Sequence, residues 1–171
     1  MTSFAPNVTI VTHVTSTSTV PCATAVRRCA VGLPALAVPV SAGTAKAPTE
    51  RFTGDVYLNP LHNGEAPSRL VAAMVRFTPG ARTNWHSHPF GQTLHCTEGV
   101  GFVATRDGGV ILMRAGDTVH TPPGEEHWHG GTRDNMMCHV ALVEHDNGMS
   151  ATWLEPVSDQ DYQAAHAHIS Q

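Results

Sequence analysis

The first 49 residues contain no aspartate or glutamate, and this absence divides the chain into two compositional zones. The charged side chains of the first zone are three basic ones, Arg27, Arg28 and Lys46. From Glu50 onward, seven arginines stand against fourteen acids, so the rest of the chain has a formal charge of −7. We therefore expect an N-terminal extension over residues 1–49 and one folded domain over residues 50–171.

Three further absences exclude classes of protein. The acidic domain has no cluster of lysine or arginine, and nucleic-acid binding depends on neutralising phosphates, so we expect no nucleic-acid partner. No run approaches the roughly 20 apolar residues that cross a bilayer, so we expect no membrane association. The four cysteines form no CxxC pair, which argues against a zinc knuckle, and Cys96 and Cys138 are expected to be buried apolar side chains.

The extension contains the parts of an export signal in an imperfect form. Arg27-Arg28 precedes the mildly apolar run Cys29–Val40, and Ala45-Lys46-Ala47 follows as a cleavage-type triplet. Abundant serine and threonine without acids are equally typical of an organelle transit peptide, and a disordered extension is the third alternative. The location stays open between cytoplasmic and, if residues 1–47 are a signal, periplasmic or exported.

Glycine and proline number 15 and 12, and the many turns that they imply favour an all-β domain of short strands. Leu70–Phe77 alternates in the way of a strand with one buried face. Similar runs predict six other strands, Phe52–Leu58, Thr93–Cys96, Gly101–Arg106, Val110–Arg114, Asp117–Thr121 and Met136–Glu144. A short C-terminal helix is expected after Ser158, which would be its N-cap.

Twelve histidines are many for this length, and some of them are spaced to share one metal ion. His86 and His88 are two residues apart, so on a strand both side chains leave the same face. Gln92 follows a bend, and His127 follows the rigid corner Pro122-Pro-Gly124. Imidazoles and an amide oxygen suit Mn, Fe, Ni, Co or Zn, and four protein ligands leave open positions for a substrate.

Glycines and prolines frame these side chains at fixed spacings. The first frame reads Gly80, five residues, His86-x-His88, three residues, Gln92, six residues and Gly99. The second frame reads Gly116, five residues, Pro122-x-Gly124, two residues, His127, three residues and Gly131.

The two frames resemble the two motifs of the cupin superfamily, over roughly residues 70–145. The resemblance implies an antiparallel jelly-roll β-barrel. It also implies one divalent metal ion bound by His86, His88, Gln92 and His127. Two positions depart from the pattern: Gln92 stands where glutamate is usual, which makes the site one charge less negative, and Gly131 replaces an asparagine.

A narrower resemblance is carried by the runs Gly80–Leu94 and Pro123–Gly130, together with His139-Val-Ala-Leu142 and the tail Trp153–Tyr162. These are similar to a group of small bacterial single-domain cupins that includes manganese-dependent hydroxynitrile lyases, which split cyanohydrins into an aldehyde and cyanide. The resemblance implies Mn(II) as the expected metal, with Fe(II), Ni(II), Co(II) or Zn(II) as alternatives. A small-molecule substrate and a homo-oligomer, dimer or tetramer, are expected by the same analogy.

The same resemblance suggests roles for residues around the metal. His139 matches the position of a general base. Independently of the resemblance, His129 lies two residues after His127 and so could share its face, as a catalytic-site residue that holds a ligand or the substrate, or as a solvent-facing one. Ala73, Val75 and Val143 match positions of the substrate pocket, and the Thr83 hydroxyl could donate to the substrate, with a plain turn residue as its alternative. The lyase-like members have a glutamine at the position of Val143, so a polar substrate contact is missing here.

Three functions fit these residues. The first is a metal-dependent lyase that cleaves or forms cyanohydrins, with the metal holding the substrate oxygen and His139 moving the proton. The second is an Fe(II)-dependent dioxygenase or oxidase. The third is a metal-dependent binding or sensor protein without turnover.

Overall fold

The computed structural model describes residues 42–168. The expected export-signal features at Arg27-Arg28, and the cysteines Cys22 and Cys29, lie outside these residues. Ordered structure begins before residue 50, because strand β1 (Ala45–Lys46) pairs with β3 (Val56–Asn63) and Ala47 is buried in the core. Whether the residues before β1 form a separate extension stays a prediction.

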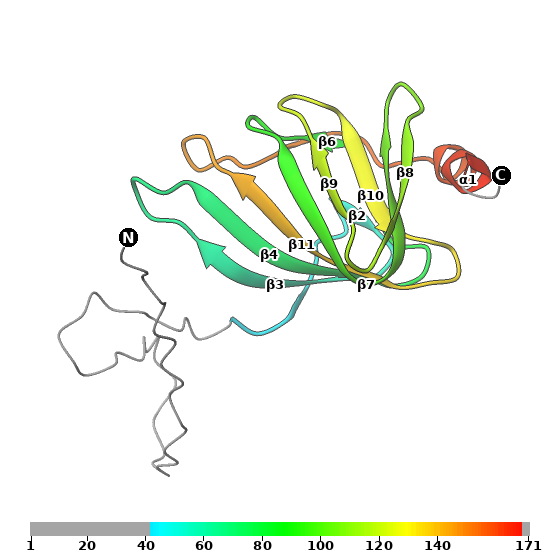
Figure 1. Cartoon of the computed structure of the whole chain (residues 1–171), viewed down its shortest axis with the longest axis horizontal. Helices are drawn as coiled ribbons and strands as arrows, with labels where there is room; N and C mark the ends of the chain where they lie inside the picture. Colours follow the sequence, from blue (N-terminus) through cyan, green and yellow to red (C-terminus); the bar gives the residue numbers. More distant parts are fainter. Residues whose placement is uncertain (1–41, 169–171) are drawn as a thin grey trace, which may run out of the picture.

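The all-β prediction is confirmed, with every strand pairing in the described residues antiparallel (Figure 1). The other strands are β2 (Phe52–Thr53), β4 (Leu70–Phe77), β5 (Arg82–Thr83), β6 (His86–Ser87), β7 (Gln92–Thr105), β8 (Val110–Arg114), β9 (Thr118–Thr121), β10 (His127–Gly131), β11 (Met137–Glu144) and β12 (Thr152–Trp153). One helix, α1 (Asp159–His168), follows them. The strands form a half-barrel of the jelly-roll type.

The long strand β7 joins the two walls of the half-barrel. Its first part pairs with β9 and β11, and its second part pairs with β8 and β10. The sequence predicted two strands here, and this was wrong, because Gly99 bends the strand without reversing it. Gly99 has φ +76°, and a Cβ on it would lie 2.0 Å from the Met136 carbonyl oxygen.

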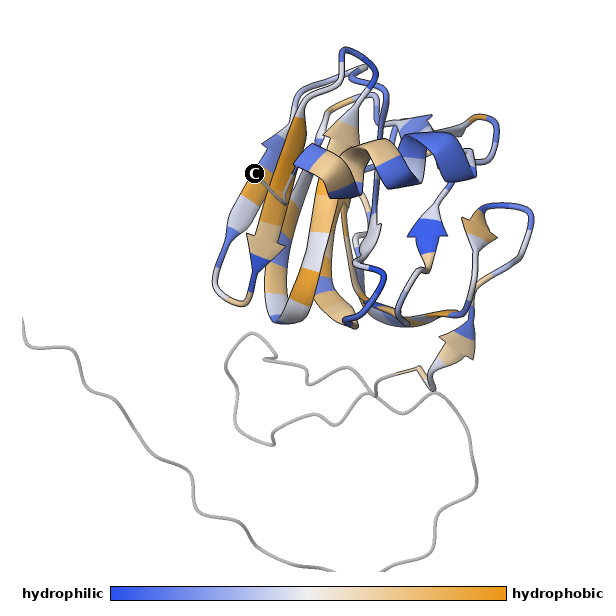
Figure 2. Cartoon of the chain, turned by 90° about the vertical axis from the view of Figure 1, so that its right-hand side faces the viewer, coloured by the Kyte–Doolittle hydropathy of each residue, from blue (hydrophilic) through white to orange (hydrophobic). Residues whose placement is uncertain are grey.

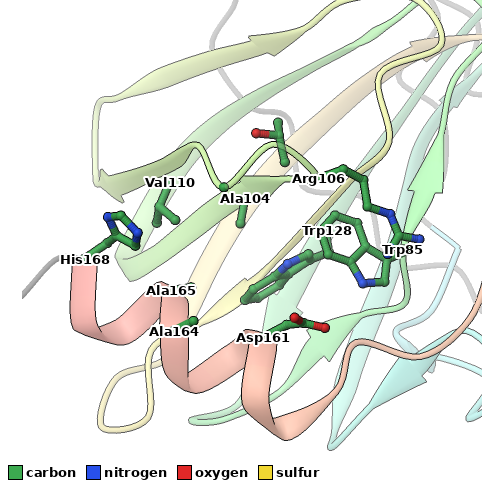
Figure 3. Close-up of a pocket in the computed structure, with 11 residues that line it drawn as sticks. Trp85, Ala104, Arg106, Val110, Trp128, Asp161, Ala164, Ala165 and His168 are labelled. Atoms are coloured by element: carbon green, nitrogen blue, oxygen red, sulfur yellow. The ribbon is translucent and has the colours of Figure 1, made fainter.

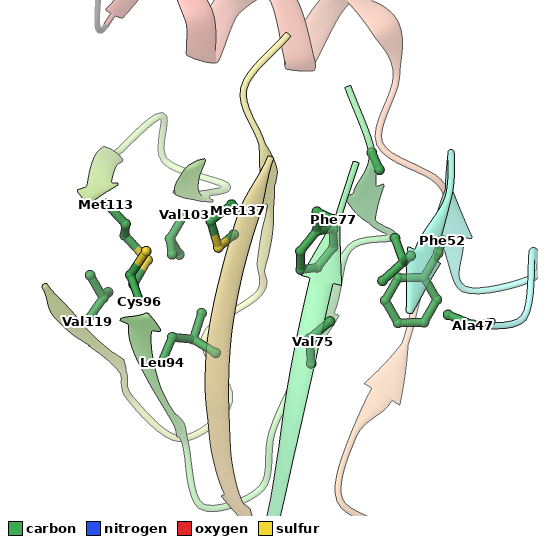
Figure 4. Packing of buried hydrophobic residues seen from close by; sticks show 12 residues of the cluster. Ala47, Phe52, Val75, Phe77, Leu94, Cys96, Val103, Met113, Val119 and Met137 are labelled. Carbon is green, nitrogen blue, oxygen red and sulfur yellow. The ribbon is translucent and has the colours of Figure 1, made fainter. Parts of the chain in front are cut away.

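The core lies inside the half-barrel, between the two walls (Figure 4). The predicted alternation of β4 is confirmed, since Val75 and Phe77 are buried in this core and Ala73 packs against it. Leu94 and Cys96 reach it from β7, which confirms the expected burial of Cys96. Burying these apolar side chains contributes about 25 cal/mol per Å² removed from water.

The helix α1 covers the outer side of the wall that is formed by β8, β10 and the second part of β7 (Figures 1 and 2). Tyr162 and Ala165 of α1 pack against Phe102 and Trp128, and the Tyr162 hydroxyl donates a hydrogen bond to the Gly131 carbonyl at 3.0 Å. The predicted N-cap is confirmed, because the Asp161 N–H donates to Ser158 Oγ at 3.0 Å. No helix among residues 42–168 is long and apolar enough to cross a membrane.

Other differences from the sequence prediction have local causes. The predicted strand Phe52–Leu58 is broken at Gly54, whose φ is +79°, and β3 then continues through Pro60. Proline is tolerated there because the register shifts at this point and β1 pairs only with Tyr57 and Leu58. Strand β10 was not predicted, because its sequence, His-Trp-His-Gly-Gly, lacks the β-branched residues that mark strands.

The bend at Gly99 gives a prediction for stability. We expect Gly99→Ala to lower the free energy of unfolding by about 3 kcal/mol or more, because it combines backbone strain with a clash against Met136. Gly80→Ala is the matched control, since Gly80 has φ +79° but open space around a Cβ, and it should cost about 1 kcal/mol. Urea denaturation measures both values. Equal losses would show that close packing at Gly99 is unimportant.

Candidate metal centre

Three strands, β6, β10 and β11, bring the histidines together inside the half-barrel. Strand β10 pairs with β6 so that His127 lies opposite His86. The alternation of β10 then places His129 on the same inner face, while Trp128 joins the outer cluster under the helix. His139 enters from β11. All of these side chains are buried, so the site is an interior cluster.

The tightest group consists of His86, His127 and His129. Each offers a ring nitrogen, and these atoms all lie within 4.8 Å of one another, so the three residues could hold a metal ion. His88 borders this group, with its ring centred 5.1 Å from that of His86 and 5.6 Å from that of His127. The structure therefore gathers three predicted ligands with Gln92, and it adds His129 as a fourth buried imidazole.

Backbone carbonyls orient three of these rings. The Nδ1 atom of His86 lies 2.9 Å from the Asn84 oxygen, that of His88 lies 2.5 Å from the Ser150 oxygen, and that of His127 lies 2.9 Å from the Glu125 oxygen. Because a carbonyl only accepts, each Nδ1 carries the proton and each Nε2 presents a lone pair. The Nε2 atom of His88 is buried and has no hydrogen-bond partner in the described residues. This donor set suits a cation.

Gln92 completes the arrangement. Its Oε1 lies 2.9 Å from the Nε2 of His127. The amide is therefore close enough to this imidazole for both side chains to bind one ion. The residues present therefore fit a divalent metal, held by neutral ligands.

Burial keeps the imidazoles neutral. Loss of solvent lowers the pKa of His127 to about 4 and that of His139 to about 3. Burial also lowers the pKa of His86, His88 and His129, and neighbouring imidazoles add to this effect for His86 and His129. Neutral imidazole is the form that binds metals, so the site is ready for an ion at neutral pH.

His129 and His139 form a second pair behind the ligands. The Nε2 of His139 lies 3.2 Å from the Nδ1 of His129, so one ring can donate a proton to the other. Phe77 packs on both rings, with centroid distances of 5.6 Å. The structure places His129 in the buried cluster, and its solvent-facing alternative is wrong, since only 3% of the residue is exposed.

Three of the four predicted pocket residues lie near this pair, and the fourth lies beside Gln92. Val75 lies across from His139 in the β4–β11 ladder, and Ala73 follows on the same face. The Thr83 hydroxyl is buried and accepts the backbone N–H of His129 at 3.2 Å. Val143 pairs with Gln92 and lines an open hollow of about 200 Å³ with Phe90 and Leu70. The structure thus links Thr83 to His129 and places Val143 beside the predicted ligand Gln92.

Sequence reasoning missed the supports of the ligands. Asn84 and Ser150 act through backbone carbonyls, which carry no sequence signal. Trp153 stacks on His86, and nothing in its position along the chain indicated this contact.

A separate hollow of about 130 Å³ lies under α1 on the outer side of the wall, between Trp85 and Trp128 (Figure 3), away from the inner face that carries the histidine cluster.

Comparisons with known proteins agree with this geometry. A family model described as a cupin domain matches residues 73–143. A cupin-like protein from Thermotoga maritima has 36% identity and a TM-score of 0.68, over 71% of this chain and 92% of that one. A cupin 2 conserved barrel domain protein from Rhodopseudomonas palustris, at 15% identity and a TM-score of 0.57 over 72% and 88% of the two chains, shares the fold. The chain therefore belongs to the cupin family.

Within this family, the chain is a homologue of a lyase. It is 42% identical over 122 residues to the (R)-mandelonitrile lyase of Granulicella tundricola. The match covers 71% of this chain and 93% of that protein. The resemblance to hydroxynitrile lyase-like cupins is thus confirmed.

The lowered pKa values predict an acid-sensitive metal-free protein. Each buried histidine has a folded-state pKa below its unfolded value of about 6.5, so its contribution to stability is complete above pH 6.5 and is lost as the pH falls toward the folded value. Protonation of each histidine in the unfolded state lowers the free energy of unfolding by up to about 1.4 kcal/mol per pH unit. We expect the free energy of unfolding after chelation, measured in urea, to drop by several kcal/mol between pH 7.5 and 5.5. An equal free energy of unfolding at the two pH values would contradict a buried cluster of neutral histidines.

Proposed function

We propose that this cupin is a metal-dependent lyase that cleaves and forms cyanohydrins. The observation that carries the proposal is the buried cluster of neutral imidazoles, in which His129 also contacts His139. The likeness to (R)-mandelonitrile lyase supports the reaction class. We include a homo-oligomer, dimer or tetramer, in the proposal by analogy with cupins of this size.

The proposed metal ligands are His86, His88, Gln92 and His127. The carbonyl-fixed Nδ1 atoms support the three imidazoles as a set, because each then turns Nε2 away from its own backbone. His129 differs from them, since its Nδ1 contacts His139. Mn(II) is the expected ion, with Fe(II), Ni(II), Co(II) or Zn(II) as alternatives; when bound, the ion supplies a Lewis acid for the substrate oxygen.

His139 is the proposed base. It takes the proton of the cyanohydrin hydroxyl. The carbonyl double bond then forms as the C–CN bond breaks, and the electron pair of the C–CN bond leaves with cyanide. His139 then returns the proton to cyanide. Burial disfavours the imidazolium in the free protein, and the cyanide charge offsets this when it develops nearby. His129, in contact with His139, holds the ring in place and shares the proton.

The substrate is proposed to be a small aldehyde-derived cyanohydrin. Ala73 and Val75 are small side chains on the inner wall, and their size favours a substrate with an aromatic or aliphatic group. Val143 offers no hydrogen bond where related lyases have glutamine, so we expect a lower catalytic efficiency than a polar residue would allow.

Removing the metal tests the reaction class. We expect mandelonitrile cleavage to fall at least about 100-fold after chelation and to return on adding Mn(II), because the Lewis acid is lost and regained. Release of benzaldehyde, followed by absorbance, measures both rates, and folding of the chelated protein is checked by circular dichroism. Unchanged cleavage without metal would refute the proposal. Oxygen uptake in place of cyanide release would indicate the dioxygenase alternative.

Replacing the base tests the role of His139. We expect His139→Ala to bind metal as the wild type does but to lower kcat for mandelonitrile by about 10²–10⁴-fold, the usual contribution of general acid–base catalysis. His95→Ala is the control, because His95 is exposed and its ring bonds to Thr118 on the outer face. A His139→Ala variant with wild-type kcat would contradict the role and favour a different base.

A further inference from the structure

The segment Ser150–Trp153 lies outside residues 73–143, which match the cupin model, yet it contacts the histidine cluster at two points. The Ser150 carbonyl accepts the Nδ1–H of His88 at 2.5 Å. Strand β12 then runs antiparallel to β6, with Trp153 directly opposite His86. One short segment therefore reaches two of the proposed ligands. Ser150 contacts His88 through a hydrogen bond, and Trp153 contacts His86 in a different way.

The second contact is a stacked pair of rings. The indole of Trp153 and the imidazole of His86 have centroids 4.8 Å apart and planes inclined by 27°. The Nδ1–H bond to the Asn84 carbonyl holds one edge of the imidazole. The ring stacked on its face resists tilting of the ring plane, because tilting would drive the imidazole into the indole. Together the two contacts fix where Nε2 points.

Trp153 is itself held from other directions. The Phe52 ring lies 5.5 Å from it, and the Arg51 guanidinium lies 5.4 Å from its centroid. The following residue continues the attachment, since the Leu154 N–H donates to the Trp85 carbonyl at 2.9 Å. The indole is therefore a fixed surface against which His86 is set.

We propose that Trp153 is a positioning residue for the metal ligand His86, acting by stacking on its imidazole. The inference rests on the ligand set of the proposed function. It extends the metal centre to the C-terminal segment, which carries neither cupin motif. Partners that orient metal ligands are usually worth 10–100-fold in metal affinity, and a ring stack of this kind falls at the lower end of that range.

The test titrates metal-free protein with Co(II) and follows the d–d absorption, which reports both affinity and coordination geometry. We expect Trp153→Leu, which keeps apolar volume without a ring, to weaken Co(II) binding about 10-fold and to alter the spectrum. Trp153→Phe keeps a ring and should bind within about threefold of the wild type. Urea unfolding of the metal-free variants separates loss of folding from loss of metal affinity.

Trp85→Leu is the matched control. Trp85 precedes His86 in the chain, but its side chain packs in the outer cluster beneath Arg106, so its loss should leave the Co(II) affinity and spectrum unchanged. Equal affinities for Trp153→Leu and Trp153→Phe would overturn the inference, as would a wild-type spectrum for Trp153→Leu. If the wild type itself binds no Co(II), the proposed function fails first.

Discussion

Three hydrogen bonds between imidazole N–H groups and backbone carbonyls are the interaction on which the centre depends. They fix the tautomers of His86, His88 and His127, so that each buried Nε2 carries a lone pair. The Nε2 of His88 is then a buried acceptor without a donor among the described residues, which is unfavourable by itself. A cation removes that cost, and burial ensures that protons do not compete with it at neutral pH.

The bend and pairing of the strands bring the segments that carry the proposed ligands to one place in the half-barrel. The bend of β7 at Gly99 lets one strand serve both walls, so that Gln92 from one wall meets His127 from the other. The pairing of β10 with β6 sets His127 against His86. Covering the outer face with α1 buries Trp128, and the alternation of β10 then directs its two histidines inward.

Much of this could be predicted from the sequence, because the information is local. The glycine and proline frames around His86, His88, Gln92 and His127 indicated the family, and the alternation of Leu70–Phe77 predicted β4 with its bounds. Contacts between distant segments could not be predicted. Ser150 contacts His88 through its backbone carbonyl, and Trp153 lies on a strand of only two residues. The burial of His129 follows from strand β10, whose glycine-rich composition is not typical of a strand.

The proposed cyanohydrin chemistry depends on one ion bound jointly by His86, His88, Gln92 and His127. Anomalous X-ray diffraction at the manganese edge, from crystals grown with Mn(II), tests this most directly. We expect one anomalous peak at bonding distance from the Nε2 atoms of the three histidines and from Oε1 of Gln92. A peak bound by His129 in place of His88, or no peak in the half-barrel, would contradict it.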